Sequence, residues 1–480
     1  MTNISKKVTK GLSWSFVGQA YTIFSQFTLG IWLARILGPK AYGLVAMVTV
    51  FSGFATLLTD FGFSSALIQK KDIDNTDYST AFWFNLGVSI ILFLAFYLLS
   101  YSFADFYDND KLVDLTKVIS FQFIISAFAF TQRVQLSKQI NFKTLTIIQI
   151  VSSLLSFAIA LILAYQDFGV WSIVAQNLTG QFVTALLLFY SVRWIPRLVF
   201  SRRSFNKLFG FGMSVTAESF LNYISRNFDN LIIGKVLGEG SLGAYSKAYS
   251  LMVFPIKNFS NVIKKVLFPS FSLMQSEVSE IKAYYLKVTN LIAFVIFPLM
   301  GVVALQSENV VMFFFGADWL DMVPLLKVFS FLGMVQAILT INGTIYLSQG
   351  RPGLAFKIGL LSKSIILICI VVGVYSNGVL GVAYGLAVAQ ILNFYPVFIT
   401  AARLIHLTLK EQLWNLSKIG LIFIVSMVLT YILNNLITFE HHLYDLVFAV
   451  VIYAVIYLVL SHIWKVNAYV LIKSKLKMKL

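Results

Sequence analysis

Long apolar stretches with few charges recur along the whole chain and are separated by short polar connections. Each stretch has about twenty residues or more, enough to cross the roughly 30 Å hydrocarbon layer of a bilayer as an α-helix. The short alternating segments of a transmembrane β-barrel are missing. The pattern predicts an all-α polytopic membrane protein with about fourteen transmembrane helices, near residues 12–36, 42–66, 80–104, 113–136, 144–165, 169–192, 208–237, 242–272, 284–306, 322–347, 354–376, 379–402, 414–436 and 443–463.

Composition strengthens this prediction. Of 480 residues, 58% are hydrophobic and only 12% are charged, whereas about a quarter of the residues of a soluble domain are charged. The single cysteine, Cys369, lies inside an apolar run, so it offers neither disulfide nor zinc chemistry. No predicted connection exceeds about twenty residues, which leaves no room for a soluble catalytic domain. We therefore expect no catalytic residues and no metal.

The basic residues alternate between loops as the positive-inside rule requires. They lie before the first span and after the second, fourth and sixth spans, and the opposite loops are often acidic, as in "DFYDND" (105–110). Topology therefore explains the formal net charge of +17, and we expect no nucleic-acid partner. Both termini are predicted to be cytoplasmic. The basic residues concerned are Lys6, Lys7, Lys10, Lys70, Lys71, Arg133, Lys138, Lys143, Arg193, Arg197, Arg202, Arg203 and Lys207.

An internal repeat is visible in the chain. "RILGPKAYG" (35–43) and "KVLGEGSLG" (235–243) match at an offset of 200, and three shorter matches follow in the same order. The repeat predicts a six-helix lobe over 1–206, a second over 207–405, and two extra helices with a basic cytoplasmic tail over 406–480. Because six is even, the two lobes are expected to be related by a pseudo-twofold axis along the membrane normal. They should then enclose a central cavity.

The glycines of the repeat also exclude a misleading motif. "GEGSLG" (238–243) fits a dinucleotide-binding fingerprint, which works only between a strand and a helix. Gly38 and Gly43 recur as Gly238 and Gly243, whereas Lys40 replaces Gly240. The conserved spacing within the chain indicates a tight external hairpin between two membrane helices.

The seventh span carries the most unusual polar residues. Glu218, Asn222, Arg226 and Asp229 follow the spacing i, i+4, i+8, i+11, which places them on one face of a helix. Arg226 is predicted within roughly 3 Å of the membrane midplane, where an arginine facing lipid costs about 2.5–3.5 kcal/mol. An interhelical ion pair that only fixes packing is one explanation. The other is a cavity that binds a substrate or an ion.

The first copy of the repeat keeps polarity at Gln19 and Gln26 but has no charge at the equivalent positions. We therefore predict that Arg226, Asn222, Gln26 and Gln19 line the substrate cavity. Asp229 and Glu218 are candidates for coupling to an ion. No bound cofactor is expected, and transport would be driven by H⁺ or Na⁺ entry or by the membrane potential.

Three stretches, "GLSWSFVGQ" (11–19), "LARILGPKAYGLVAM" (33–47) and "LTDFGFSSALIQKKD" (58–72), resemble Wzx-type lipid-linked polysaccharide flippases. These form the polysaccharide transporter branch of the MOP superfamily, which includes exporters of colanic and teichuronic acid. The resemblance covers essentially the whole chain. It implies a MOP/MATE-like fold and a cavity in which arginines, here Arg226, bind an acidic headgroup.

The resemblance further implies a function. An undecaprenyl-pyrophosphate-linked oligosaccharide would be moved by alternating access from the inner to the outer leaflet of the bacterial cytoplasmic (inner) membrane, for surface or exopolysaccharide biosynthesis. Expected partners are this oligosaccharide, membrane lipid and the polysaccharide polymerase machinery, with the chain itself a monomer. The sugar composition is not readable from the sequence.

Two other functions are open at this point. A cation-coupled multidrug or small-molecule antiporter would need Asp229 and Glu218 and would tolerate the loss of Arg226. A membrane-embedded polysaccharide polymerase or ligase would need a large outer loop with catalytic groups, which the spacing of the spans does not provide. His441 and His442 are adjacent in a short outer connection, and we expect them in a solvated turn.

Overall fold

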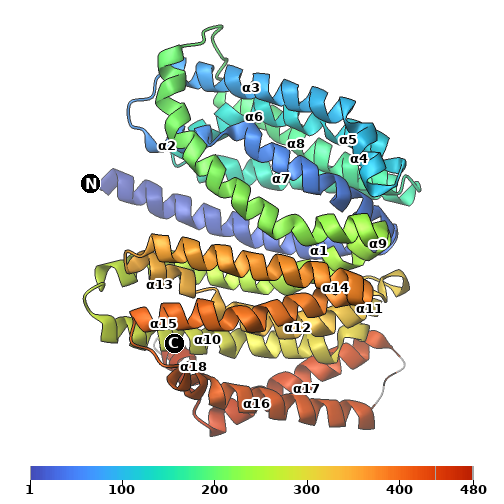
Figure 1. The fold of residues 1–480 in the computed structure, drawn as a ribbon, viewed down its shortest axis with the longest axis vertical. Helices are drawn as coiled ribbons and strands as arrows, with labels where there is room; N and C mark the ends of the chain where they lie inside the picture. Colours follow the sequence, from blue (N-terminus) through green and yellow to red (C-terminus); the bar gives the residue numbers. More distant parts are fainter. Residues whose placement is uncertain (1, 438, 440, 478–480) are drawn as a thin grey trace. The chain divides into compact units, whose positions relative to one another are not determined.

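The computed structural model describes residues 2–437, 439 and 441–477, and all of its regular elements are helical (Figure 1). The elements are α1 (Thr2–Asp60), α2 (Phe63–Gln69), α3 (Asn75–Leu98), α4 (Ser100–Tyr107), α5 (Lys111–Ile119), α6 (Phe121–Lys138), α7 (Phe142–Tyr165), α8 (Val170–Val192), α9 (Arg202–Leu273), α10 (Val278–Leu305), α11 (Ser307–Phe314), η1 (Ala317–Trp319), α12 (Met322–Leu339), α13 (Asn342–Ser348), α14 (Pro352–Phe394), η2 (Tyr395–Ile399), α15 (Thr400–Leu404), α16 (Leu409–Leu436), α17 (His442–Ile463) and α18 (Asn467–Lys477).

Ten helical segments in the described part of the chain are long and apolar enough to cross a membrane. Three of the longest helices are interrupted by non-helical backbone, α1 at Gly38, α9 at Gly238 and α14 at Asn377 and Gly378. Dividing them there provides a helix for every predicted span. The prediction of an all-α, multi-pass membrane protein is confirmed.

The chain forms two compact units, Met1–Gly243 and Ala244–Leu480, called unit 1 and unit 2 below. The boundary falls inside α9, after the predicted seventh span, whereas the second lobe was predicted to begin before that span. The lobe boundaries at 206 and 405 concern the repeat and stay a prediction.

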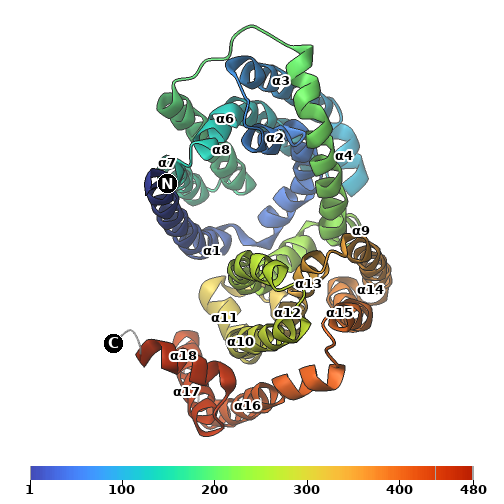
Figure 2. The ribbon, with the colours of Figure 1, turned by 90° about the vertical axis from the view of Figure 1, so that its left-hand side faces the viewer.

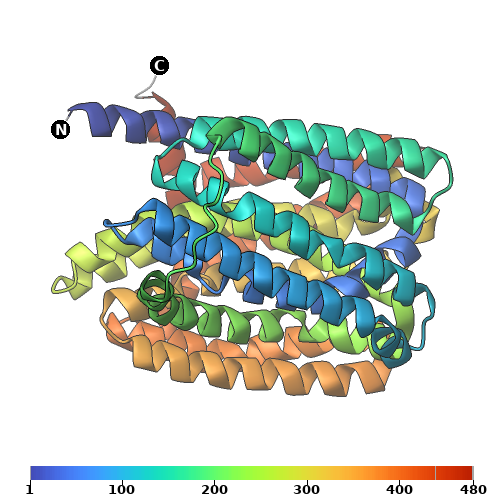
Figure 3. The ribbon, with the colours of Figure 1, turned by 90° about the horizontal axis from the view of Figure 1, so that it is seen from above.

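In unit 1, α7 packs against α1 and α8, and α6 packs against α3 and α8. Figures 2 and 3 show α3, α6, α7 and α8 running side by side along one direction. The first part of α9 lies along the second part of α1. Tyr223 Oη is 3.0 Å from the carbonyl oxygens of both Thr49 and Val50.

The two duplicated hairpins cross each other within unit 1. Gly38 (φ 69°, ψ 175°) and Gly238 (φ 79°, ψ −178°) share a conformation that is open essentially to glycine alone. A Cβ on Gly43 would lie 1.7 Å from the carbonyl oxygen of Glu239, and a Cβ on Gly243 would lie 1.9 Å from that of Pro39. Each hairpin therefore uses its last glycine to admit the backbone of the other, which agrees with the predicted structural role of these glycines.

In unit 2, α10 packs against α12 and α16, α12 packs against α14, and α16 packs against α17. Residues 467–477 of the predicted tail form the helix α18. Val466 and Ala468 are each 1% exposed, and α18 packs against α10 and α17. Burial of these apolar side chains explains why the tail folds back.

Candidate substrate-binding cavity

Unit 1 contains a cavity of about 500 Å³ whose wall carries both polar and apolar side chains. Its volume lies within the roughly 300–1,000 Å³ range of small-molecule sites in proteins. The described residues that line it come from α1, the turn after it, α2, α3, α6, α8 and α9: Thr56, Leu57, Thr59, Asp60, Gly62, Ser64, Asn85, Gln122, Ser126, Ala129, Phe130, Arg133, Val134, Gln181, Thr216 and Ser219.

Asp60 is held by the turn that joins α1 to α2. Phe61 (φ 44°) and Gly62 (φ 65°) reverse the chain there, and the Asp60 carboxylate accepts hydrogen bonds from the backbone N–H of Ser64 (2.8 Å) and from its hydroxyl. The carboxylate thus satisfies donors in the first turn of α2, where a negative charge is favourable. Its position in the wall is fixed by α2.

Arg133 reaches the cavity from α6. Its side chain is exposed in the cavity, and within the described part of the chain its guanidinium has neither an ion pair nor a hydrogen bond, Asp60 included. An arginine that faces a cavity and not lipid favours an anionic or strongly polar partner. Its five N–H donors suit a carboxylate or a phosphate.

Three amide side chains add neutral hydrogen-bonding groups to the wall, Asn85, Gln122 and Gln181. Asn85 is only 3% exposed and donates from Nδ2 to the carbonyl oxygen of Thr59 at 2.6 Å. Its Oδ1 and the Nε2 of Gln122 are buried and have no hydrogen-bond partner among the described residues. Because buried polar atoms are nearly always paired, these amides indicate a wall suited to a polyhydroxylated ligand.

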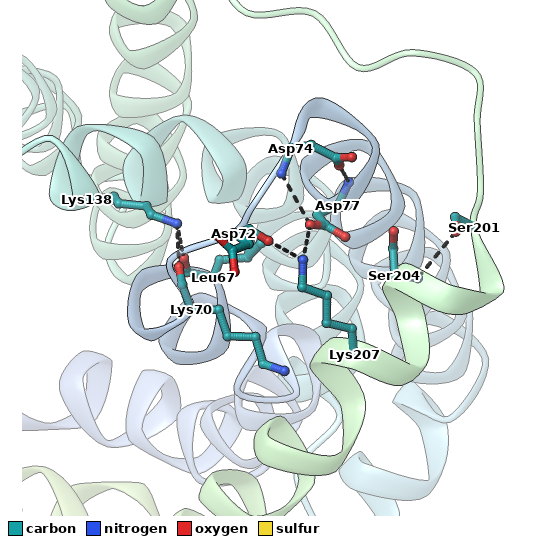
Figure 4. A network of polar contacts seen from close by, with 9 residues as sticks. All are labelled: Leu67, Lys70, Asp72, Asp74, Asp77, Lys138, Ser201, Ser204 and Lys207. Atoms are coloured by element: carbon teal, nitrogen blue, oxygen red, sulfur yellow. Dashed lines mark hydrogen bonds and ion pairs between the residues drawn. The ribbon is translucent and has the colours of Figure 1, made fainter.

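A network of polar contacts lies beside this cavity, where the α2–α3 connection meets the start of α9 (Figure 4). Lys207 Nζ is 2.7 Å from Asp77 Oδ2 and also donates to the carbonyl oxygen of Asp72. Lys138 Nζ donates to the carbonyl oxygens of Leu67 (2.9 Å) and Lys70 (2.8 Å). Lys138 therefore connects α6 to the end of α2, and Lys207 connects α9 to the α2–α3 connection and the start of α3.

Asp77 has a second role in this network. It is the N3 residue of a capping box with Asp74, in which Asp77 N–H donates to Asp74 Oδ1 at 2.8 Å. The carboxylate of Asp77 is therefore shared between the N-terminus of α3 and Lys207. Both arrangements stabilise the negative charge at a helix N-terminus.

The predicted site residues lie on α1 and α9. Arg226 and Gln19 are exposed, Asn222 is half-buried, and Asp229 is 7% exposed with its Oδ1 accepting from the backbone N–H of Asn230 at 2.8 Å. The side chains of Gln26 and Glu218 lie outside the described part. No ion pair joins the described side chains of Arg226 and Asp229, and the choice between a substrate site and an interhelical ion pair stays a prediction.

None of the six predicted residues is among the described residues that line the unit 1 cavity. Arg226 is nevertheless related to it, because Ser219 lines the cavity and lies seven residues earlier on α9. Seven residues are nearly two full turns, so the two side chains share a face about 10 Å apart along the axis. Arg226 therefore shares a helical face with one residue of the cavity wall, although it is not itself among the described lining residues.

Arg133 was not predicted as a site residue, because it counted only among the basic residues that mark the cytoplasmic side of the fourth span. In the structure Arg133 belongs to α6, and Gln122, Ser126, Phe130 and Arg133 line the cavity at the spacing i, i+4, i+8, i+11. This is the spacing that drew attention to the seventh span. The rule selected four polar residues on the seventh span, whereas Phe130 interrupts the polar set on α6, so spacing gave only a partial signal here.

The fold and the cavity together define a polytopic helical membrane protein whose unit 1 contains a cavity lined by polar and apolar side chains. A family model described as "Polysaccharide biosynthesis protein" matches residues 32–324. The chain belongs to this family, and the predicted resemblance is confirmed.

Characterised relatives and a solved structure extend this result. The chain is 28% identical to the teichuronic acid biosynthesis protein TuaB of Bacillus subtilis (strain 168), over 87% of each chain. It is 27% identical to the lipopolysaccharide biosynthesis protein WzxC of Escherichia coli (strain K12), over 82% of this chain and 80% of that one. The lipid II flippase MurJ in an inward closed conformation has a TM-score of 0.73, with 16% identity over 94% of this chain and 98% of MurJ. At that identity the match shows a common fold.

Proposed function

We propose that this protein is a transporter, not an enzyme, which flips an undecaprenyl-pyrophosphate-linked oligosaccharide from the inner to the outer leaflet of the cytoplasmic membrane by alternating access. The family and the names of the relatives support a role in polysaccharide biosynthesis. The shared fold with a lipid II flippase supports movement of a lipid-linked sugar. The N- and C-termini are cytoplasmic in this proposal, and the transporter acts as a monomer that hands its substrate to the polymerase machinery.

The observation that carries the proposal is the cavity of unit 1, in which the Arg133 guanidinium has no ion pair or hydrogen bond with any described residue. A lipid-linked sugar does not cross a bilayer unaided, because its hydroxyls and pyrophosphate would lose their hydrogen bonds to water. A cavity lined by amides, hydroxyls and a guanidinium replaces those bonds. The isoprenoid tail meanwhile remains in the lipid.

In this mechanism different cavity residues bind different parts of the substrate headgroup. Arg133 binds an acidic group on the sugar or the pyrophosphate, and Asn85, Gln122 and Gln181 bind sugar hydroxyls. Arg226, Asn222, Gln19 and Gln26 receive the headgroup when it leaves this cavity along the α9 face.

Two sources of energy are compatible with these residues. An inside-negative membrane potential drives an anionic headgroup outward by about 2.3 kcal/mol per charge per 100 mV. Alternatively, Asp229, which is 7% exposed, and Glu218 take up H⁺ or Na⁺ during the cycle. No bound cofactor takes part in either scheme.

Deletion of the gene and complementation with variants test the proposal. Loss of the protein should leave lipid-linked oligosaccharide on the cytoplasmic face, where an impermeant periodate or lectin probe does not reach it in intact spheroplasts. Wild type and the control Arg203→Ala, at the exposed start of α9, should restore exposure, whereas Arg133→Ala should not.

Two outcomes would contradict the proposal. If the deletion strain exposed the oligosaccharide normally and became sensitive to cationic drugs, the chain would be a multidrug antiporter. If it exposed unpolymerised units on the outer face, the chain would be a polymerase or ligase.

A further inference from the structure

Unit 2 contains a smaller pocket that the proposed function does not use. It has a volume of about 160 Å³ and lies where α10 ends, α11 begins and α16 ends. The described residues that line it are Leu305, Gln306, Glu308, Asn309, Thr430, Tyr431, Asn434 and Asn435.

The wall of this pocket favours a positive charge. None of its described residues is Lys or Arg, and Glu308 contributes an exposed carboxylate. Two helix C-termini meet there, because Gln306 is the C-cap of α10 and Asn434 and Asn435 lie in the last turn of α16. Each C-terminus has a partial negative charge. The N-terminus of α11 opposes them, but the full charge of Glu308 in its first turn outweighs it.

Two acceptor atoms in the wall lack partners. Thr430 is 2% exposed, and its Oγ1 and the Oδ1 of Asn434 are buried without a hydrogen bond to any described residue. Leaving such atoms unpaired costs about 1–3 kcal/mol each by mutational measures. A ligand with N–H donors would remove that cost.

The rest of the pocket is rigidly built. Asn309 Nδ2 donates to Gln306 Oε1 at 2.7 Å, and His442 Nδ1 lies 2.7 Å from Asn309 Oδ1. His442 was predicted in a solvated turn, but it begins α17 and joins that helix to the pocket wall. The pocket wall is therefore formed by the long helices α10 and α16 and the short helix α11, and His442 connects it to α17.

We propose that this pocket binds a primary ammonium group. Such a group has three N–H donors and one positive charge, which match the Glu308 carboxylate, Thr430 Oγ1 and Asn434 Oδ1. The volume is several times the roughly 30 Å³ of a water molecule, so a bare metal ion would not fill it.

Two sources of this chemistry are available, a soluble amine and the headgroup of an aminolipid. The position of the pocket favours the lipid source. It lies at the end of α16, where Leu429 and Ile432, next in the chain to the pocket residues Thr430 and Tyr431, are exposed. Tyr431 is 59% exposed, and aromatic side chains of this kind concentrate at membrane interfaces.

Thermal unfolding of the purified full-length protein tests the ligand class. Ethanolamine should raise the unfolding midpoint, whereas choline, which has no N–H donor, and NaCl at the same ionic strength should not. Glu308→Gln should weaken the ethanolamine response at least tenfold and Thr430→Val severalfold. Glu280→Gln, an exposed glutamate in the first turn of α10, is the matched control and should respond as wild type does.

Native mass spectrometry of protein released from nanodiscs identifies the source. Preferential retention of phosphatidylethanolamine over phosphatidylcholine, lost in Glu308→Gln, assigns the site to a lipid headgroup. Equal retention together with an ethanolamine response assigns it to a soluble amine. The proposal is overturned if wild type responds to neither probe, if NaCl or choline has the same effect as ethanolamine, or if Glu308→Gln responds as wild type does.

Discussion

Two helices of unit 1 carry stripes at the same spacing, one of them mostly polar with a phenylalanine and the other wholly polar. Comparing them shows what the spacing predicts and what only the packing decides. On α6 the positions are Gln122, Ser126, Phe130 and Arg133, and all four line the cavity. On α9 they are Glu218, Asn222, Arg226 and Asp229, of which Arg226 is exposed and Asp229 is buried. The spacing places four side chains on one helical face in both cases. The neighbours of that face determine whether it lines a cavity.

The largest effect is expected from substitutions of the glycines at which the two hairpins cross. Gly43→Ala or Gly243→Ala would drive a methyl group into the backbone of the opposite hairpin and should destabilise unit 1 by about 3 kcal/mol or more. The α9 stripe would be displaced, because the crossing hairpins hold the first part of α9 to α1. The measurement is the thermal unfolding midpoint in detergent.

Gly240→Ala is the matched control for the hairpins. The nearest atom to a Cβ at this position is Lys40 Cγ at 3.9 Å, so the change should stay within about 0.5 kcal/mol. Equal losses in Gly240→Ala and Gly43→Ala would contradict the reciprocal packing.

The next effect compares the two arginines. Arg133→Ala removes charge-assisted hydrogen bonds to the substrate, each worth about 1.5–3 kcal/mol, and should lower the flipping rate about tenfold to a hundredfold in reconstituted vesicles. Arg226→Ala should have a smaller effect, since Arg226 lies outside the described cavity wall. A larger loss in Arg226→Ala than in Arg133→Ala would reverse the assignment of the primary site.

A moderate effect is expected at the network in Figure 4. Lys207→Met leaves the Asp77 carboxylate, whose side chain is 5% exposed, without its cation, at a cost of about 1–3 kcal/mol. The double variant Lys207→Met/Asp77→Asn should recover much of the unfolding midpoint, because no charge is then left unpaired. No recovery would mean that Lys207 acts through its bond to the Asp72 carbonyl instead.

The smallest effect should come from a neutral member of the α6 stripe. Gln122→Leu removes one amide from the cavity wall and should lower the flipping rate severalfold, as expected for a neutral hydrogen bond of about 0.5–1.5 kcal/mol. Gln139→Leu, at the exposed C-cap of the same helix, should leave the rate unchanged. A similar loss in both variants would show that the α6 stripe has no special role.

The fold was largely predictable because membrane spans follow from hydrophobicity alone. In the hydrocarbon layer every backbone group must be bonded within its own segment, so each apolar stretch of sufficient length becomes a helix. The hairpins at Gly38 and Gly238 were found for a related reason. Only glycine tolerates their backbone conformation, and the repeat brought both positions to attention.

The candidate site was predicted less well. In the sequence Arg133 is a basic residue near the end of an apolar span. The positive-inside rule accounts for such a residue without any cavity. Whether an arginine near a helix end faces water, lipid or a cavity depends on the helices beside it. Here Asp60 on α1, Asn85 on α3 and Gln181 on α8 enclose it.

Sequence by itself determined the number of spans, the polar faces of individual helices, the duplicated hairpins and the family, because each depends on local hydrophobicity, helical periodicity or the conformational limits of glycine. Tertiary structure alone decided which polar face encloses a cavity and which acceptors in unit 2 remain unpaired. Those properties depend on the mutual packing of α1, α3, α6, α8 and α9, and of α10, α11 and α16, whose contacts join residues tens to hundreds of positions apart. No local pattern records such contacts.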